Sequence, residues 1–524
     1  MSYYLTLLEC GSIQSYIFAS NRLREAVGGS YIVKQATEQW LSRHLQEWLS
    51  TRFNKDLTAR VEVDNWKTTQ PSQILEPNGQ ELQAELLFSG GGNAAILFRD
   101  KDRAKDFVSY YSSLLIKEAP ALVLLAAVCE VSAGLKLALE TAEKELYELK
   151  EQGWNGFVRP GLSITRSCAT TGQPAAGQRR HPEPEWLSAG SIRRYKEASH
   201  SEANLKEAFA KLLEDKYQFP LDLDELGGRE GENHLAVVHI DGNRIGEQLR
   251  QVRQSASDDQ NLVVELRNFS KLIREVSQEA LEATLEDLVR ALPALEKKGL
   301  QLAKVRDKKT GKPTGKHYFP LRPLIYGGDD LTFVCEGRIG LTLAACYLSH
   351  FNQLKNGRFS ACAGIAIART HFPLTRAYQL SEKLCSNAKK ASRQSGEEKS
   401  SWLDFQILLG GLTGTLEQLR HDTSKLYRRP WRVEPSTRKD EQSWSRFREA
   451  IAIFQNSERW SRSQVKDLRV ALAAGPDATG RFLEQSTLRG RELPEWPGIQ
   501  KNGWSGSKTP FYDPIEALDF YLTL

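Results

Sequence analysis

The chain has 524 residues, of which 26% are charged, 40% hydrophobic and 9% aromatic. This composition is typical of a folded protein of about three or four domains, and it excludes collagen-like, disordered and disulfide-stapled chains. The longest uninterrupted apolar run, Ala121 to Cys129, is far shorter than the ~20 residues that cross a bilayer. Seven cysteines without CxxC spacing and an N-terminus unlike a signal peptide predict a cytoplasmic protein with reduced thiols and no membrane contact.

The net charge of +5 is too small to indicate nucleic-acid binding by itself. One stretch, Lys297 to Arg322, has nine Lys/Arg against a single acidic residue, Asp307. Its glycines and proline predict a solvated loop. Two interpretations stay open: an exposed basic hairpin tip, or a contact to a phosphate backbone.

The first part of the chain alternates strand and helix patterns. Tyr3–Leu8 predicts a strand, and helical spacing after it predicts a helix that stops at Gly28-Gly29. The further predicted elements are a helix with apolar positions at 32–45, two strands in 86–98 around three glycines, a helix at 102–116 and a strand at 122–131.

The same order returns later in the chain. Strands are predicted at 234–240, on both sides of Gly327-Gly328 and at 360–368, with helices at about 261–292, 339–354 and 373–390. Each copy fits a βαββαβ ferredoxin-like domain, an antiparallel sheet with helices on one face. GGNAAILF at 91–98 corresponds to GGDDLTFV at 327–334, which indicates an internal duplication.

We therefore predict an α+β protein with two ferredoxin-like domains, an intervening insert and a C-terminal helical domain. The predicted boundaries are 1–152, 153–232, 233–405 and 406–524. In the last segment the tryptophans favour the core of a helical bundle, although a base-stacking surface is an alternative.

Three carboxylates carry the chemical signal. Asp241 ends an apolar strand, and Asp329-Asp330 follow the tight turn at Gly327-Gly328. In a ferredoxin-like sheet we expect the first strand to lie beside the strand that begins the hairpin, so these carboxylates would stand together. Because clustered carboxylates repel, they predict a two-metal site for Mg²⁺ or Mn²⁺, the arrangement used in nucleotidyl transfer.

Other residues support or weaken this interpretation. GGDD by itself is also typical of an ordinary hairpin turn, and Lys389 could be a solvated helix end or a contact to the β- and γ-phosphates of a nucleotide. In the first copy, Cys10 is aligned with Asp241 and Asn93 with Asp329, so we expect no metal pair there. Its retained glycines still allow a pocket for a second, acceptor nucleotide.

Together these residues resemble a known family, the large polymerase-like subunit of type III CRISPR–Cas effector complexes. The resemblance rests on GSIQSYIFASNRLREAVGGSYIV (11–33), FSGGGN (88–93), HIDGNRIG (239–246), YGGDD (326–330) and SACAGIAIA…PLTRAYQLSEKLCSNAKK (360–390). It implies two palm domains and a cyclase that joins ATP 3′ to 5′ into cyclic oligoadenylate, a second messenger of antiviral defence. The implied partners are ATP and, unless the chain acts alone, guide and target RNA with other effector subunits.

The resemblance implies that Asp241, Asp329 and Asp330 are the metal-binding carboxylates and that Lys389 contacts the triphosphate, in agreement with the interpretation of the residues themselves. We predict Asp241, Asp329 and Asp330 as catalytic residues and add Gly242 to them as a metal-binding position. The predicted nucleotide-binding positions are Gly327, Gly328, Lys389, Gly91, Gly92 and Asn93.

Three departures from the family are visible. The chain starts at the first palm, so we expect no HD nuclease; only Cys168 remains of the usual zinc module, so we expect no zinc; and Asn243 replaces a second aspartate. Two other functions stay open: a non-catalytic RNA-binding scaffold, and a GGDEF-like dinucleotide cyclase, which usually has one palm per chain.

Overall fold

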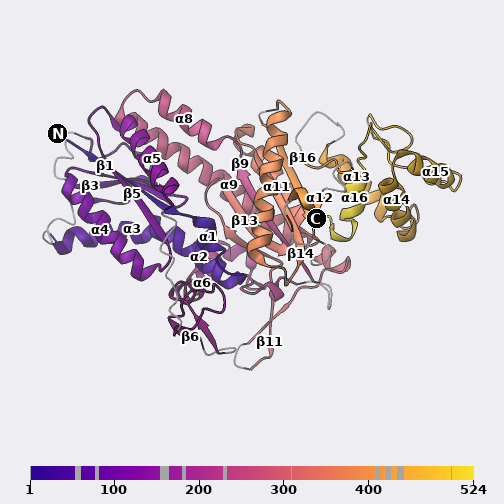
Figure 1. Cartoon of the computed structure of the whole chain (residues 1–524), viewed down its shortest axis with the longest axis horizontal. Helices are drawn as coiled ribbons and strands as arrows, with labels where there is room; N and C mark the ends of the chain where they lie inside the picture. Colours follow the sequence, from indigo (N-terminus) through magenta and orange to yellow (C-terminus); the bar gives the residue numbers. More distant parts are fainter. Residues whose placement is uncertain are drawn as a thin grey trace. The chain divides into compact units, whose positions relative to one another are not determined.

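The computed structural model describes residues 2–52, 61–76, 82–153, 164–179, 184–227, 233–307, 310–397, 399–408, 414, 416–420, 426–433, 442–496 and 498–524. The chain forms two units (Figure 1). The first comprises Met1–Ala208 and Arg244–Glu275, and the second comprises Phe209–Asn243 and Val276–Leu524. Helix α9 (Asp259–Lys297) contributes residues to both units.

The first unit is built on a five-stranded sheet of order β2-β3-β4-β1-β5. Its strands are β1 (Tyr4–Gly11), β2 (Val61–Glu62), β3 (Ala84–Gly90), β4 (Asn93–Phe98) and β5 (Val123–Glu130). Its helices are α1 (Ile13–Ile17), α2 (Leu23–Thr37), α3 (Gln39–Arg52), α4 (Lys101–Glu118), α5 (Leu135–Glu151), α6 (Ala189–Ala208) and α8 (Ile245–Ser255), and β6 (Gly177–Arg179) pairs with β7 (Glu185–Leu187).

The second unit is built on a six-stranded sheet of order β12-β13-β9-β14-β15-β16. Its strands are β9 (His234–Gly242), β12 (Leu321–Ile325), β13 (Asp330–Glu336), β14 (Ala361–Arg369), β15 (Ser401–Ile407) and β16 (Trp431–Val433). Its helices include α7 (Ala210–Leu213), α10 (Gly340–Gln353), α11 (Leu374–Gln394), α12 (Leu416–Arg420), α13 (Trp444–Gln455), α14 (Arg462–Ala474), α15 (Pro476–Thr487) and α16 (Tyr512–Ala517).

The α+β class and the two ferredoxin-like sheets predicted from the sequence are confirmed. The strand orders β3-β4-β1-β5 and β12-β13-β9-β14 are the same arrangement used twice. One detail of the prediction is wrong: the strand beside β9 is β13, the second strand of the hairpin rather than the strand that begins it. The consequence is that Asp330, the first residue of β13, is the one brought next to β9.

The prediction that helices cover one face of the sheet is also wrong. A Cβ at Gly340 of α10 would lie 2.3 Å from Ala236, whereas Gly364 of β14 faces α11. Ala236 and Asp241 are five positions apart on β9, so they point to opposite faces. Helix α10 therefore covers one face of the second sheet. Helix α11 covers the face that carries Asp241, and Figure 1 shows α11 lying across the strands of this sheet.

The helix predicted to stop at Gly28-Gly29 continues through both glycines as α2. A Cβ at Gly28 would lie 1.7 Å from the carbonyl oxygen of Arg194 on α6. These glycines therefore permit close helix packing and do not end a helix. Because α6 packs on α2, the segment predicted as an insert supplies a helix to the first unit.

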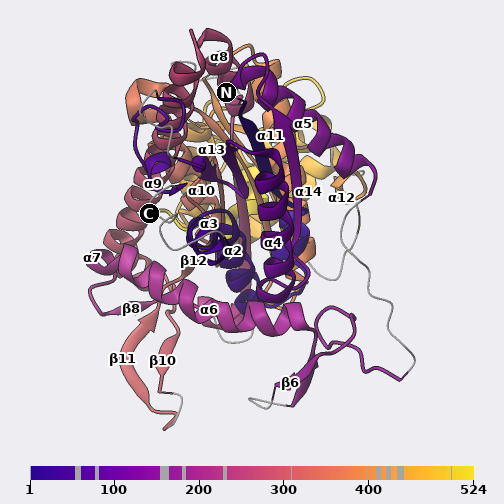
Figure 2. The same ribbon diagram turned by 90° about the vertical axis from the view of Figure 1, so that its left-hand side faces the viewer.

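Two further segments refine the predictions. The basic stretch forms an antiparallel hairpin of β10 (Lys304–Arg306) and β11 (Pro313–Tyr318), which extends beside β8 (Tyr217–Gln218) (Figure 2). Lys308 and Lys309 lie outside the described residues. Trp431 belongs to a strand, because β16 extends the sheet before the helical region begins.

Candidate active site

Asp241 and Asp330 face each other across two neighbouring strands. In the antiparallel pair of β9 and β13 they occupy directly opposite positions. Opposite residues point to the same face with Cβ atoms about 4.5–5.5 Å apart. The strand is a continuous apolar run that is buried from Leu235 to Ile240, and Asp241 follows it near the end of β9, where its side chain is only partly buried.

Lys389 comes to these carboxylates from α11. Its Nζ lies 2.6 Å from Oδ2 of Asp241 and donates to the carbonyl oxygen of Gly242 at 2.9 Å. The close approach of α11 depends on Gly364, where a Cβ would lie 2.0 Å from the carbonyl oxygen of Ser381. The sequence predicted Lys389 at the end of a helix, and the structure shows that its ammonium group contacts Asp241.

The carboxylates destabilise one another's charge. Burial, and then the negative charge of Asp241, raise the pKa of Asp329 above its ordinary value. Burial, and then the charges of Asp329 and Asp241, raise the pKa of Asp330 well above its ordinary value. Lys389 pairs with one of the three carboxylates, Asp241, so ionising all three at this edge of the sheet is unfavourable without a further cation.

His239 completes the inner part of the site and is not among the residues selected from the sequence. It lies two residues before Asp241 on the same face of β9, and it forms a group of potential metal ligands with Asp241 and Asp330. Its Nδ1 lies 3.0 Å from Oγ1 of Thr332, the residue opposite on β13. Tyr378 of α11 packs edge-on against the ring.

We expect the His239 ring to stay neutral at physiological pH. Burial lowers its pKa to about 4, despite the opposing charge of Asp241. Because the folded pKa lies below the ordinary value, the stability that it contributes is present above pH ~6.5 and is lost as the pH falls toward 4. Ring resonances assigned by comparison with His239→Gln should not titrate between pH ~8 and ~5.5; a midpoint near ~6.5 would contradict the prediction.

The turn before β13 leaves room in front of the carboxylates. Gly327 has φ of +99°, and no atom lies within 4 Å of a Cβ built at Gly327 or Gly328. Asn243, which stands where the resembled family has a second aspartate, is buried and donates to Oγ of Ser360 and the carbonyl oxygen of Ser400. Its amide therefore holds β9 to its neighbours and does not add a carboxylate to the site.

The donor set fits Mg²⁺ or Mn²⁺. Three carboxylates and the carbonyl of Gly242 supply the hard oxygen ligands that these ions prefer, and the open turn leaves space for water or phosphate oxygens. A bound cation would also relieve the repulsion that raises the pKa of Asp330. The ligands would be Asp241, Asp329 and Asp330.

The first sheet has a related arrangement with fewer charged residues at the ends of its strands. Glu9 of β1 is directly opposite Asn93, the first residue of β4, as Asp241 is opposite Asp330. Oε1 of Glu9 forms an ion pair with Nζ of Lys150 at 2.6 Å. Lys150 follows the first residue of α5 by 15 positions, and Lys389 follows the first residue of α11 by the same number.

The predicted alignments of Cys10 with Asp241 and of Asn93 with Asp329 are therefore wrong by one position, because the strand register aligns Glu9 with Asp241 and Asn93 with Asp330. In both sheets, the residue just before the helix that follows the first strand has a left-handed backbone conformation: Ser12 in the first sheet and Arg244 in the second. Glu9 lies three residues before Ser12, and Asp241 lies three residues before Arg244, so this landmark also aligns Glu9 with Asp241. Burial raises the pKa of Cys10 to about 12, so its thiol stays protonated. Of the nearby glycines, Gly91 faces open space, whereas a Cβ at Gly92 would lie 2.4 Å from Ile13.

Residues 234–396, which carry these carboxylates, match the family described as Cas10/Cmr2, second palm domain. The chain contains a Cas10/Cmr2-type palm. A comparison with curated proteins finds no match to the chain.

Solved structures similar to the chain include a Csm1-Csm4 cassette in complex with pppApA, at 12% identity and a TM-score of 0.47, covering 98% of this chain and 69% of that one. The cassette in complex with cA4 has 12% identity and a TM-score of 0.42, covering 98% and 70%. Csm1 in T. onnurineus has 13% identity and a TM-score of 0.40, covering 98% and 69%.

The residues of the two units that sequence analysis missed share one property. His239, Glu9 and Lys150 acquire partners only through strand register and helix packing. A histidine two residues before a strand-end aspartate is the one signal that could have singled out His239, since alternate residues of a strand share a face.

Proposed function

We propose that the Cas10/Cmr2-type palm is a metal-dependent nucleotidyltransferase that joins ATP molecules 3′ to 5′ and closes them into cyclic oligoadenylate. The observation that carries this proposal is the meeting of Asp241 and Asp330 across β9 and β13, with Lys389 on the same carboxylates. Excess negative charge beside an open glycine turn is the environment that a metal-bound nucleoside triphosphate requires.

Each residue has a role in this proposal. Asp241, Asp329 and Asp330 hold the divalent cations, which when bound activate the attacking 3′-hydroxyl and neutralise charge on the triphosphate. Lys389 moves from Asp241 to the β- and γ-phosphates and stabilises the charge of the leaving pyrophosphate. Gly327 and Gly328 admit the phosphates because neither has a side chain in the open space before the turn.

The first palm would serve as the acceptor site. Glu9, the carboxylate that corresponds to Asp241, is already neutralised by Lys150, and Asn93 is opposite it without charge. This site is therefore suited to hold an uncharged part of a nucleotide rather than a metal pair, with Gly91 leaving open space at the turn.

The proposed partners are ATP and the RNA and protein subunits of a type III effector complex. Exposed basic side chains of the β10–β11 hairpin, including Lys304, Arg306 and Lys312, offer contacts for an RNA backbone. Among the helices that the structure describes, none is long and apolar enough to span a bilayer.

The direct test is incubation of the purified full chain with Mg²⁺ or Mn²⁺ and each of the four NTPs, with products identified by mass spectrometry. We expect pyrophosphate and cyclic adenylates from ATP. If the chain alone is silent, guide and target RNA with partner subunits are added. Equal product from a D329A/D330A double variant would overturn the proposal, and turnover of GTP alone would favour a dinucleotide cyclase.

Lys389→Met should lower ATP turnover by roughly 10–100-fold, because the variant loses the cation that faces the phosphates. The matched control is Lys390→Met, which removes an exposed lysine at the next position of α11. Steady-state kinetics on both variants makes the measurement. Equal rates for the two variants would show that Lys389 only neutralises Asp241.

A further inference from the structure

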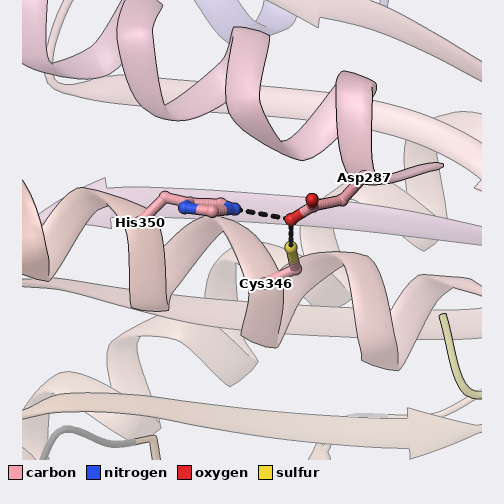
Figure 3. Close-up of side chains that lie close together, drawn as sticks. All are labelled: Asp287, Cys346 and His350. Atoms are coloured by element: carbon pink, nitrogen blue, oxygen red, sulfur yellow. Dashed lines mark hydrogen bonds and ion pairs between the residues drawn. The ribbon is translucent and has the colours of Figure 1, made fainter. Parts of the chain in front are cut away.

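A second cluster of metal-ligating side chains lies on the helices of the second unit (Figure 3). Cys346 and His350 stand one turn apart on α10, and Asp287 reaches them from α9. Oδ2 of Asp287 accepts from Sγ of Cys346 at 3.2 Å and lies 2.7 Å from Nε2 of His350. All three ligand atoms lie within 4.8 Å of one another.

These distances are close to those of a tetrahedral metal site. With metal bonds of about 2.3 Å to sulfur and about 2.0 Å to nitrogen or oxygen, ligand atoms are separated by roughly 3.3–3.5 Å. The observed contacts need to open by only a few tenths of an ångström to accept an ion. Because Cys346 and His350 are four residues apart on a helix, they already project in the same direction.

The surroundings hold the carboxylate in place. The other oxygen of Asp287, Oδ1, accepts from Arg290 at 2.6 Å, which leaves Oδ2 directed at Cys346 and His350. Such outer contacts orient metal ligands. The three residues line a cavity of ≈ 560 Å³ that also includes Ser349 and Arg448, so a fourth coordination position is open to a small ligand.

The arrangement does not favour a nucleophilic cysteine. In a Cys–His pair the imidazole must contact the sulfur in order to take its proton. Here Cys346 and His350 both contact the same oxygen of Asp287, so the imidazole is engaged by the carboxylate and not by the thiol. The mixed sulfur, nitrogen and oxygen donors instead match zinc and related ions, and they do not suit Mg²⁺.

We propose that Asp287, Cys346 and His350 form a tetrahedral site for a divalent transition metal of the zinc class, with its fourth position open to the cavity. On binding, the thiol of Cys346 releases its proton to solvent, and the thiolate, the carboxylate and a neutral imidazole become the ligands. The ion would join α9 to α10. Because α10 covers the face of the sheet opposite Asp241, this site is separate from the carboxylate site and does not depend on the proposed function.

Cobalt(II) titration of the full chain, stripped of metal by dialysis against a chelator, tests the proposal. A thiolate bound to Co²⁺ gives a charge-transfer band in the near ultraviolet, and tetrahedral coordination gives intense visible bands. We expect both at one equivalent, and we expect Zn²⁺ to abolish them by displacing Co²⁺. Because Cys362 lies directly opposite Asp241 on β14, the band is assigned to the cluster of Asp287, Cys346 and His350 by its loss in Cys346→Ser.

Three variants decide which residues bind the ion. Cys346→Ser should remove the charge-transfer band, and Asp287→Asn, which keeps the side-chain shape, should weaken Co²⁺ binding by at least about 100-fold. Cys168→Ser is the matched control, because this buried thiol lies outside the cluster, among hydroxyl groups of the first unit. Absence of the band in the wild type, its persistence in Cys346→Ser or its loss in Cys168→Ser would each overturn the proposal.

Discussion

Replacing Asp330 by asparagine is expected to lower nucleotide transfer by about 10³-fold, equivalent to ~4 kcal/mol of transition-state stabilisation. Asparagine has the same shape and keeps the strand register, but it cannot supply the negative charge that holds a divalent cation. The loss should appear in kcat at saturating ATP and Mg²⁺, measured by pyrophosphate release. Because Asp330 is directly opposite Asp241, Asp241→Asn should give a loss of the same order.

The control for this experiment is Asp467→Asn, which removes an exposed carboxylate from α14 in the same unit. Its rate should equal that of the wild type. Circular dichroism of Asp330→Asn should be unchanged, since the variant removes charge repulsion rather than a packing contact. A variant that folds and still turns over ATP within about tenfold of the wild type would place the chemistry elsewhere.

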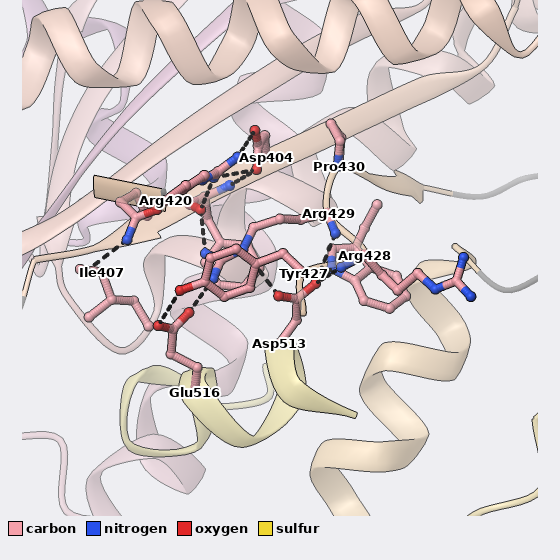
Figure 4. A network of polar contacts seen from close by, with 12 residues as sticks. Asp404, Ile407, Arg420, Tyr427, Arg428, Arg429, Pro430, Asp513 and Glu516 are labelled. Atoms are coloured by element: carbon pink, nitrogen blue, oxygen red, sulfur yellow. Dashed lines mark hydrogen bonds and ion pairs between the residues drawn. The ribbon is translucent and has the colours of Figure 1, made fainter. Parts of the chain in front are cut away.

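The second large effect concerns stability and a buried ion-pair network (Figure 4). Asp513 of α16 is fully buried and accepts hydrogen bonds from the backbone N–H groups of Arg428 and Arg429, from Nε of Arg429 and from Nε1 of Trp431. Arg429 is also buried and pairs with Glu516. The network fastens the C-terminal helices to β15, because Arg429 also donates to the carbonyl oxygen of Phe405 at 2.5 Å.

Asp513→Ala should destabilise the second unit by about 3–5 kcal/mol, because the change leaves the Arg429 charge buried without its main partner. The measurement is the shift of the urea unfolding midpoint. Asp519→Ala is the matched control: it breaks the pair of Asp519 with Arg462, whose side chains are 60% and 76% exposed, and should cost less than about 1 kcal/mol. Equal shifts would show that the buried network contributes no more than a surface pair.

The sequence was sufficient to predict the repeated sheets, because apolar runs and glycine turns are local signals. It also predicted that Asp241 ends a strand and that Asp329 and Asp330 follow the glycine turn. It was wrong about the strand that lies beside β9, which depends on how the hairpin folds back, and about Gly28-Gly29, whose role is set by the approach of Arg194 from α6. Local pattern cannot distinguish a glycine that ends a helix from one that admits a neighbouring backbone.

The partners of buried charged residues could not be predicted either, because they are distant in sequence and meet only through packing. Nothing near Asp513 in sequence indicates that it will meet Arg429, more than 80 positions earlier. Likewise, Asp287 is separated by 59 residues from Cys346, and only the packing of α9 on α10 brings them together. Residues of this kind need strand order and helix packing before their chemistry can be inferred.

The two acid–lysine pairs, Glu9 with Lys150 in the first unit and Asp241 with Lys389 in the second, have different numbers of carboxylates around them. This difference bears on the stability of each unit. In the first sheet, Glu9 and Lys150 neutralise each other, so this pair calls for no further cation. In the second, Lys389 pairs with one carboxylate of three, and ions at the proposed metal site would stabilise the folded unit by binding to it. The proposed function therefore predicts that divalent ions raise the stability of the second unit through a site that has no counterpart at Glu9.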